Sequence, residues 1–206
     1  MYDFLLTPEE RALRDEVRKF TREEISSDFL RKMDKDEIVY PREFVEKLAQ
    51  YNLRGIRFPK KYGGREMSWV AEVAAFEEIG CLGIALGCAF AMPSIVGEAL
   101  QHFGTEEQKQ KYLKPYLEGK LVSAEALTEP RGGSDFFGAT TRAVLEGDHF
   151  VVNGQKRFVV GAEGADFFVV YCRTNFAPDA HKHNRISLLI IDKGPGVETE
   201  HLYGLM

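Results

Sequence analysis

The feature that most constrains the fold is a change in the spacing of apolar residues near residue 120. Before this point, apolar side chains recur every three or four residues, which is the period of a helix that buries one face. After it, the chain breaks into short runs rich in β-branched and aromatic residues, as strands are. Because the helical part precedes the strand part and the two do not alternate, the sequence predicts an α+β fold with segregated parts.

Two domains are expected along the chain. Residues 1–121 are expected to form an N-terminal all-helical domain, and residues 122–206 a small antiparallel β-domain. The β-domain is expected to be incomplete, because the chain stops shortly after a turn at residues 193–196. Such an early stop would leave unpaired strand edges, which natural domains normally cover or blunt.

Hydroxyl residues and prolines mark where the predicted helices begin. Residues 7–10 (TPEE) combine an N-cap hydroxyl, a proline at the first helical position and a carboxylate three residues after the cap. Residues 105–108 (TEEQ) form a second capping box. Pro41 opens a further helix, with Gly55 as the cap beyond its end. An amphipathic helix is expected over residues 68–79, and a more apolar one follows it.

The second half of the chain contains five predicted strands. They are residues 140–145, 149–152, 157–160, 167–171 and 186–192. The dipeptide Asn153-Gly154 stands between the second and the third, and it is typical of the type I′ turn of a two-residue hairpin. The sequence therefore predicts a hairpin that joins the second predicted strand to the third.

Charge, cysteine content and the N-terminus narrow the classes of function. The net charge is −5 and the 27 basic residues are scattered, which argues against nucleic-acid binding. Three cysteines without a CxxC pattern fit reduced thiols in the cytoplasm better than disulfides or a zinc site. The start lacks the features of a secretory signal. The longest apolar stretch, residues 83–97, is too short to span a membrane. We expect a cytoplasmic protein that holds no metal.

The segment most informative about function is residues 123–135, at the change from helices to strands. Its paired glycines let the backbone approach a ligand closely, and Thr128 and Ser134 offer hydroxyl groups. A planar heterocycle or a thioester requires such a surface. Taken alone, the same composition is as typical of a glycine-rich loop between domains.

The string TEPRGGSD at residues 128–135 resembles the Thr-Glu-Pro-x-Ala/Gly-Gly-Ser-Asp signature of the acyl-CoA dehydrogenase family. The resemblance continues in VNGQKRFVV at residues 152–160 and ADFFVV at residues 165–170, in the same order and spacing. In the helical half it includes FGTEEQK at residues 103–109. It therefore covers nearly the whole chain.

The resemblance implies a helical N-terminal domain, a middle β-domain and a C-terminal four-helix domain, with FAD between the last two and near a neighbouring subunit. This chain would supply the first and most of the second. The family removes the α-proton of an acyl-CoA with a glutamate, while the β-hydrogen leaves as hydride to flavin N5 and gives the 2,3-enoyl-CoA. Electrons then pass to an electron-transfer flavoprotein. The family's glutamate lies beyond residue 206, so the resemblance assigns no catalytic residue here, and a homo-oligomer or a partner chain is expected.

The resemblance also assigns the binding residues. Those implied to contact FAD are Glu125, Ala126, Leu127, Thr128, Gly133, Ser134, Phe158, Val159 and Val160. Ser134 is also implied to contact the acyl-CoA substrate, and Phe158 to lie against the isoalloxazine ring in a strand that continues through Val160. The family usually has a hydroxyl residue near flavin N5 where this sequence has Val160, and valine can neither donate nor accept a hydrogen bond. The flavin potential or the substrate class is therefore expected to differ.

Several other residues could carry chemistry but have simpler interpretations. The carboxylates of Glu125, Glu129 and Asp135 are interpreted as surface or loop groups rather than a general base. His181 and His183 lack a third metal ligand. Cys81 and Cys88 are seven residues apart, so we expect them on one helix face in the core and not as a redox pair.

Three alternatives to an acyl-CoA dehydrogenase remain at this stage. The first is a non-catalytic subunit that completes a flavin site with a partner chain. The second is a flavin-dependent acyl-CoA oxidase of the same superfamily, in which oxygen reaches the reduced flavin. The third is a binding module without flavin.

Overall fold

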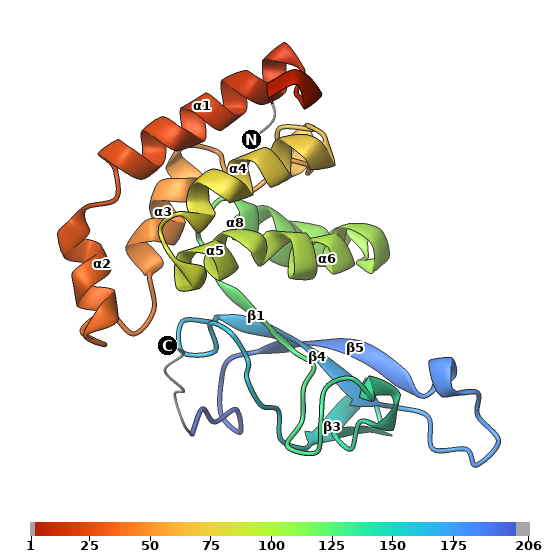
Figure 1. Ribbon diagram of the computed structural model, residues 1–206. Helices are drawn as coiled ribbons and strands as arrows, with labels where there is room; N and C mark the ends of the chain where they lie inside the picture. The colour runs from red at the N-terminus through yellow and green to blue at the C-terminus, as the bar shows by residue number, and fades with distance from the viewer. Residues whose placement is uncertain (1–2, 201–206) are drawn as a thin grey trace. The chain divides into compact units, whose positions relative to one another are not determined.

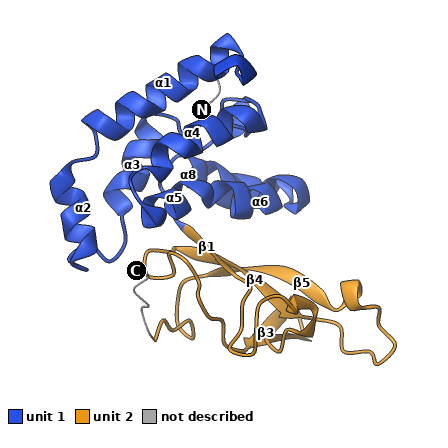
Figure 2. Cartoon of the chain, in the orientation of Figure 1, with its two compact units in different colours: residues 1–122 blue, residues 123–206 orange. Residues whose placement is uncertain are grey.

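The structure is a computed structural model that describes residues 3–200, in two compact units of residues 1–122 and 123–206 (Figure 2). The helices of the first unit are α1 Pro8–Glu23, α2 Ser27–Asp34, α3 Arg42–Gln50, α4 Trp69–Gly80, α5 Ile84–Ala91, α6 Glu98–Phe103, α7 Glu106–Gln108 and α8 Lys114–Leu117 (Figure 1). The strands of the second unit are β1 Ser123–Ala126, β2 Arg142–Glu146, β3 His149–Asn153, β4 Phe167–Arg173 and β5 Ile186–Asp192. The described part is thus α+β, as the change in apolar spacing predicts.

Local capping signals place the helix starts correctly. The Thr7 hydroxyl accepts a hydrogen bond from the Glu10 main-chain N–H, and the Glu10 carboxylate accepts one from the Thr7 N–H at 2.9 Å, which confirms the predicted capping box. The predicted box at residues 105–108 is confirmed in the same way. The expected cap at Gly55 is wrong: α3 already ends at Gln50, and Asn52 adopts the left-handed conformation with φ 53°. Asparagine tolerates that conformation better than most residues.

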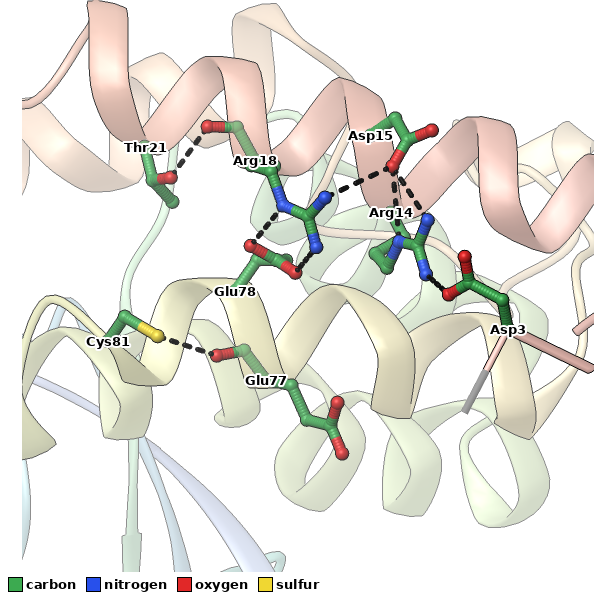
Figure 3. A network of polar contacts seen from close by, with 8 residues as sticks. All are labelled: Asp3, Arg14, Asp15, Arg18, Thr21, Glu77, Glu78 and Cys81. Carbon is green, nitrogen blue, oxygen red and sulfur yellow. Dashed lines mark hydrogen bonds and ion pairs between the residues drawn. The ribbon is translucent and has the colours of Figure 1, made fainter. Parts of the chain in front are cut away.

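The core of the helical unit lies between α1, α3, α4 and α5. α1 and α4 lie side by side (Figure 1), and both oxygens of Glu78 on α4 accept hydrogen bonds from the Arg18 guanidinium on α1, at 2.7 and 3.1 Å (Figure 3). The buried apolar side chains of this core are Leu13, Val17, Phe20, Ile25, Phe44, Leu48, Leu53, Ile56, Ala71, Ala75, Ile79, Leu86 and Phe90. They follow the helical spacing of the sequence, so a single amphipathic pattern specifies both the helices and their packing.

The predicted apolar helix forms in pieces. α5 passes into a π-helical turn at Pro93–Gly97 and then into α6, because Pro93 has no N–H for the regular helical hydrogen bond. The 20-residue run Ile84–Phe103 is long and apolar enough to cross a membrane by length and composition alone, and it extends past residues 83–97, the stretch that the sequence interpretation considered too short. A core helix of a globular domain meets the same criterion, and Leu86 and Leu100 are buried.

The second unit is a five-stranded sheet with mixed strand directions, which corrects the prediction of an antiparallel sheet. β4 pairs parallel with β1 and, through Arg173 and Arg142, with β2; it pairs antiparallel with β5. A parallel neighbour needs a long connection that returns the chain to the same end of the sheet. Residues 127–166 form that connection between β1 and β4, and they carry most of the predicted site residues.

The predicted hairpin at Asn153-Gly154 is wrong. The hairpin turn lies one strand earlier, at residues 147–148, where Gly147 has φ 66° and joins β2 to β3. The predicted strand at residues 157–160 does not form, because Phe158 has φ 57°, outside the strand region. Gly154 serves a close approach instead: a Cβ there would lie 2.4 Å from the Thr141 hydroxyl oxygen.

Candidate flavin-binding site

β1 carries the chain from the helical unit into the glycine-rich loop. It pairs with β4, and Ala124 and Ala126 are buried in the core of the sheet. Glu125 lies between these two alanines and is half-buried. Its carboxylate accepts a hydrogen bond of 3.0 Å from the Tyr171 hydroxyl of β4. Burial, together with the Glu125 charge, raises the pKa of Tyr171 to about 12. Tyr171 is therefore a hydrogen-bond donor and not a proton source at neutral pH.

The glycine-rich segment after β1 forms a tight turn. The main-chain groups of Glu129 and Gly132 pair in both directions, at 2.9 and 3.2 Å, and Gly132 has φ 150°. A Cβ on Gly133 would lie 3.0 Å from the Thr128 hydroxyl oxygen, so the glycine leaves room for that hydroxyl. The two glycines thus have separate roles, one in the backbone conformation and one in a close approach.

Glu129 was expected to be a surface or loop carboxylate; it lies in the loop after β1, but it is buried and only 3% of the residue is exposed. Its carboxylate accepts hydrogen bonds from the Thr140 main-chain N–H at 2.7 Å, the Thr140 hydroxyl at 2.6 Å and the Thr141 main-chain N–H at 2.8 Å. The Lys156 ammonium donates a fourth at 3.0 Å. Burial alone would raise the pKa of Glu129, but the hydrogen bonds from Thr140 and Thr141 outweigh it and hold this pKa far below its ordinary value.

A second segment, residues 156–160, is attached to the loop beside Thr128. The Lys156 ammonium donates to the Leu127 carbonyl oxygen at 3.0 Å, and the Arg157 main-chain N–H donates to the Thr128 carbonyl oxygen at 2.8 Å. These contacts bring together residues that are about thirty positions apart in the sequence. The structure thus joins the two segments on which most of the predicted binding residues lie.

The side chains that follow on this second segment differ in exposure. Phe158 is 58% exposed with the Arg157 guanidinium over its ring, Val160 is 45% exposed, and Val159 packs against the core of the sheet. Phe158 was expected in a strand, and the left-handed backbone at this residue overturns that expectation. The assignment of Phe158, Val159 and Val160 to cofactor binding stays a prediction.

Two hydroxyl groups near this junction are available to a ligand. Within residues 3–200, the side chains of Thr128 and Ser134 make no hydrogen bond to protein, and Ser134 is exposed between Gly133 and Asp135. Uncommitted hydroxyls on one joined segment and an exposed aromatic side chain on the other fit a planar ligand that is rich in hydrogen-bond acceptors. The residues present therefore fit a flavin, although the structure describes the protein alone.

The sequence interpretation does not single out the residues that hold this junction together: Lys156 and Thr140, which use their side chains, and Thr141, which uses its main-chain N–H. Lys156 lies inside the VNGQKRFVV motif, so its position was the one signal that could have found it. No local sequence pattern identifies Thr140 and Thr141 as site residues, because they resemble ordinary strand residues. Both donate hydrogen bonds to the Glu129 carboxylate, which lies more than ten residues earlier in the chain.

Other candidate groups belong to other segments of the described chain. Cys81 caps α4 and is exposed, while Cys88 is half-buried in α5, so the expected common helix face is wrong. The rings of His181 and His183 stack at 5.1 Å. Among the described residues, no group of three or more histidine, cysteine, aspartate or glutamate side chains could hold a metal ion.

Comparison with known proteins gives the family. The N-terminal domain model of the acyl-CoA dehydrogenases matches residues 7–120, and the middle domain model matches residues 124–206. A short-chain-specific acyl-CoA dehydrogenase of Clostridium acetobutylicum is 40% identical over 197 residues, which cover 93% of this chain and 50% of that protein. The CarC subunit of the caffeyl-CoA reductase-Etf complex of Acetobacterium woodii is 36% identical, over 94% of this chain and 52% of that protein.

A solved structure agrees with these relatives. The crystal structure of acyl-CoA dehydrogenase from Geobacillus kaustophilus superposes with a TM-score of 0.83 at 34% identity, over 93% of this chain and 50% of that one. The chain thus spans about half the length of the relatives it matches. The matched family uses FAD. On two family models and a shared fold, the chain belongs to the acyl-CoA dehydrogenase family.

Proposed function

We propose that the protein catalyses the FAD-dependent α,β-dehydrogenation of an acyl-CoA thioester to the 2,3-enoyl-CoA, and that this chain supplies residues on the flavin side of that reaction. The observation that carries the proposal is the junction of two segments through the Arg157 N–H and the Thr128 carbonyl, 2.8 Å apart. Among the described residues, the Thr128 and Ser134 hydroxyls have no protein partner, and the Phe158 side chain is 58% exposed.

Each available group has a distinct role in this proposal. The bound flavin would supply the two-electron acceptor for the β-hydrogen of the substrate. The Thr128 hydroxyl would donate a hydrogen bond to the flavin ring, and the Phe158 side chain would exclude water from one side of that ring. The Ser134 hydroxyl orients the acyl-CoA. We assign no general base within residues 3–200. Glu129 in particular is not proposed, because its buried carboxylate already accepts four hydrogen bonds.

Electron-transfer flavoprotein is the proposed electron acceptor. The support is the similarity to the Acetobacterium woodii protein, which is named as a subunit of a reductase-Etf complex. A homo-oligomer, or a partner chain that completes the flavin site, is a further prediction. Cytoplasmic location likewise stays a prediction from the cysteine pattern.

The test uses the full-length protein encoded by the gene, purified with its cofactor. Anaerobic addition of a panel of acyl-CoA thioesters should bleach the visible flavin band, and mass spectrometry should find the matching enoyl-CoA. A flavin-loaded protein that no member of the panel bleaches contradicts the proposal. Rapid oxygen consumption during turnover would instead indicate an oxidase, and a protein that stays colourless with added FAD would indicate a binding module.

A further inference from the structure

Glu129 and Lys156 form an ion pair that is shielded from water on both sides. The side chains are 2% and 9% exposed, and the carboxylate and ammonium are 3.0 Å apart. Removing two charges from water costs free energy that their attraction does not reliably restore, so a buried pair is weak evidence for a contribution to stability. A role in geometry is the better-supported explanation, and the positions of the two residues indicate which geometry is held.

The ion pair holds the chain on both sides of Thr128. The Lys156 ammonium contacts the residue on each side of it, the Leu127 carbonyl oxygen and the Glu129 carboxylate, both at 3.0 Å. The next residue along the chain, Arg157, donates its main-chain N–H to the Thr128 carbonyl oxygen at 2.8 Å. Phe158 follows directly. The Thr128 main chain and the segment that carries the Phe158 ring are therefore fixed to one another by three contacts.

The far side of the Glu129 carboxylate is anchored as well. Three donors from Thr140 and Thr141, at 2.6 to 2.8 Å, tie it to the chain just before β2. Because these donors orient both oxygens, the carboxylate cannot rotate to follow a displaced Lys156. These three hydrogen bonds therefore fix the junction relative to the start of β2.

We propose that Glu129 and Lys156 are positioning residues, whose buried ion pair holds Thr128 and Phe158 in the arrangement that FAD requires. This inference rests on the proposed function, because it takes Thr128 and Phe158 as flavin contacts. Neither member of the pair touches the flavin in this account; each acts through the main chain beside it. Outer partners of this kind tune affinity by orienting the groups that bind directly.

A catalytic role for Glu129 fits the site less well. Four donors occupy its carboxylate, and its pKa is held far below the ordinary value, so it is a poor proton acceptor. The structure thus favours a fixed anion over a group that exchanges protons.

The experiment measures FAD binding to the full-length apoprotein by flavin fluorescence, and then records the visible spectrum and reduction potential at saturating FAD. Glu129→Gln and Lys156→Met each leave one buried charge without its partner, and each should weaken FAD binding by about 10- to 100-fold. The double variant should bind more tightly than the product of the two losses predicts, because it leaves no unpaired charge. Glu146→Gln, at an exposed carboxylate of β2, is the matched control and should bind as wild type.

The outcomes separate positioning from stability. Single variants that melt at lower temperature yet keep wild-type FAD affinity, spectrum and potential overturn the inference and leave the proposed function intact. A wild-type protein that binds no FAD overturns both. If Glu129→Gln does not fold, Thr140→Val removes one donor to the carboxylate and should weaken FAD binding by about 2- to 10-fold; wild-type affinity and spectrum in that variant contradict the proposal.

Discussion

The threonine and serine hydroxyls around the junction differ in whether they hydrogen-bond to protein. The Thr140 hydroxyl donates to Glu129 at 2.6 Å, whereas within residues 3–200 those of Thr128 and Ser134 have no protein partner. Removing an uncommitted hydroxyl costs the folded protein little, so any effect must come through a ligand. This distinction gives the prediction for Ser134.

Ser134→Ala in the full-length protein should lower kcat/KM for acyl-CoA by an amount that corresponds to the loss of one hydrogen bond, about 0.5–1.5 kcal/mol. The melting temperature should stay close to wild type, because Ser134 is exposed. Steady-state kinetics and thermal unfolding on the same preparation check this. Equal loss of stability with unchanged kinetics would refute the assignment.

Val160 stands at the position where the family resemblance implies a hydroxyl residue near flavin N5. The residue is 45% exposed and lies outside the strands, so a hydroxyl introduced there would not be buried without water. Val160→Thr should therefore change stability by no more than about 0.5 kcal/mol. If the side chain faces the flavin, the added donor should shift the reduction potential. An unaltered potential in a stable, flavin-loaded variant would end this idea.

At the scale of elements, local signals and long-range contacts differ in how well a sequence reveals them. The capping boxes at Thr7 and Thr105 are complete within four residues, so the sequence predicts the starts of α1 and α7 correctly. The error at residues 157–160 has a long-range cause. The run is rich in β-branched and aromatic residues, yet Lys156 and Arg157 bond to the loop near Thr128, and Phe158 leaves the strand conformation.

The same contrast applies to Glu129. The TEPRGGSD motif identifies the loop, but burial of this carboxylate depends on donors at Thr140, Thr141 and Lys156 that no local pattern connects to it. The mixed sheet was missed for a similar reason, because strand direction follows from the long connection between β1 and β4 and not from strand composition. Motifs thus predict which residues form the site, and tertiary contacts decide how they are held.

Gly154 gives a prediction at this scale, since it serves the close approach of residues 154 and 141 and not a hairpin turn. A methyl group at Gly154 would lie 2.4 Å from the Thr141 hydroxyl oxygen. Gly154→Ala should therefore destabilise the protein by about 1–3 kcal/mol, as overpacked sites do. Gly194→Ala, where a Cβ meets nothing within 4 Å, is the control and should be nearly neutral. Denaturant unfolding measures both, and equal stability of the two variants would contradict the packing described.

At the scale of the whole molecule, the chain matches the family's N-terminal and middle domains and spans about half the length of its relatives. We predict that the 206-residue chain by itself oxidises no acyl-CoA, because the family resemblance implies a catalytic glutamate outside the two matched domains. Dye reduction with a panel of acyl-CoA substrates is the measurement. Turnover above a control without protein would show this prediction to be wrong.

The central claim is that residues 125–134 and 156–160 form the flavin-binding face of this chain. Hydrogen exchange of the full-length protein, followed by mass spectrometry with and without FAD, tests it most directly, because bound ligand slows exchange of the amides it covers or fixes. The account predicts that FAD protects peptides from both segments, and that Glu146→Gln leaves this protection unchanged. A protein that binds FAD while both segments exchange as fast as in the apoprotein would contradict the account.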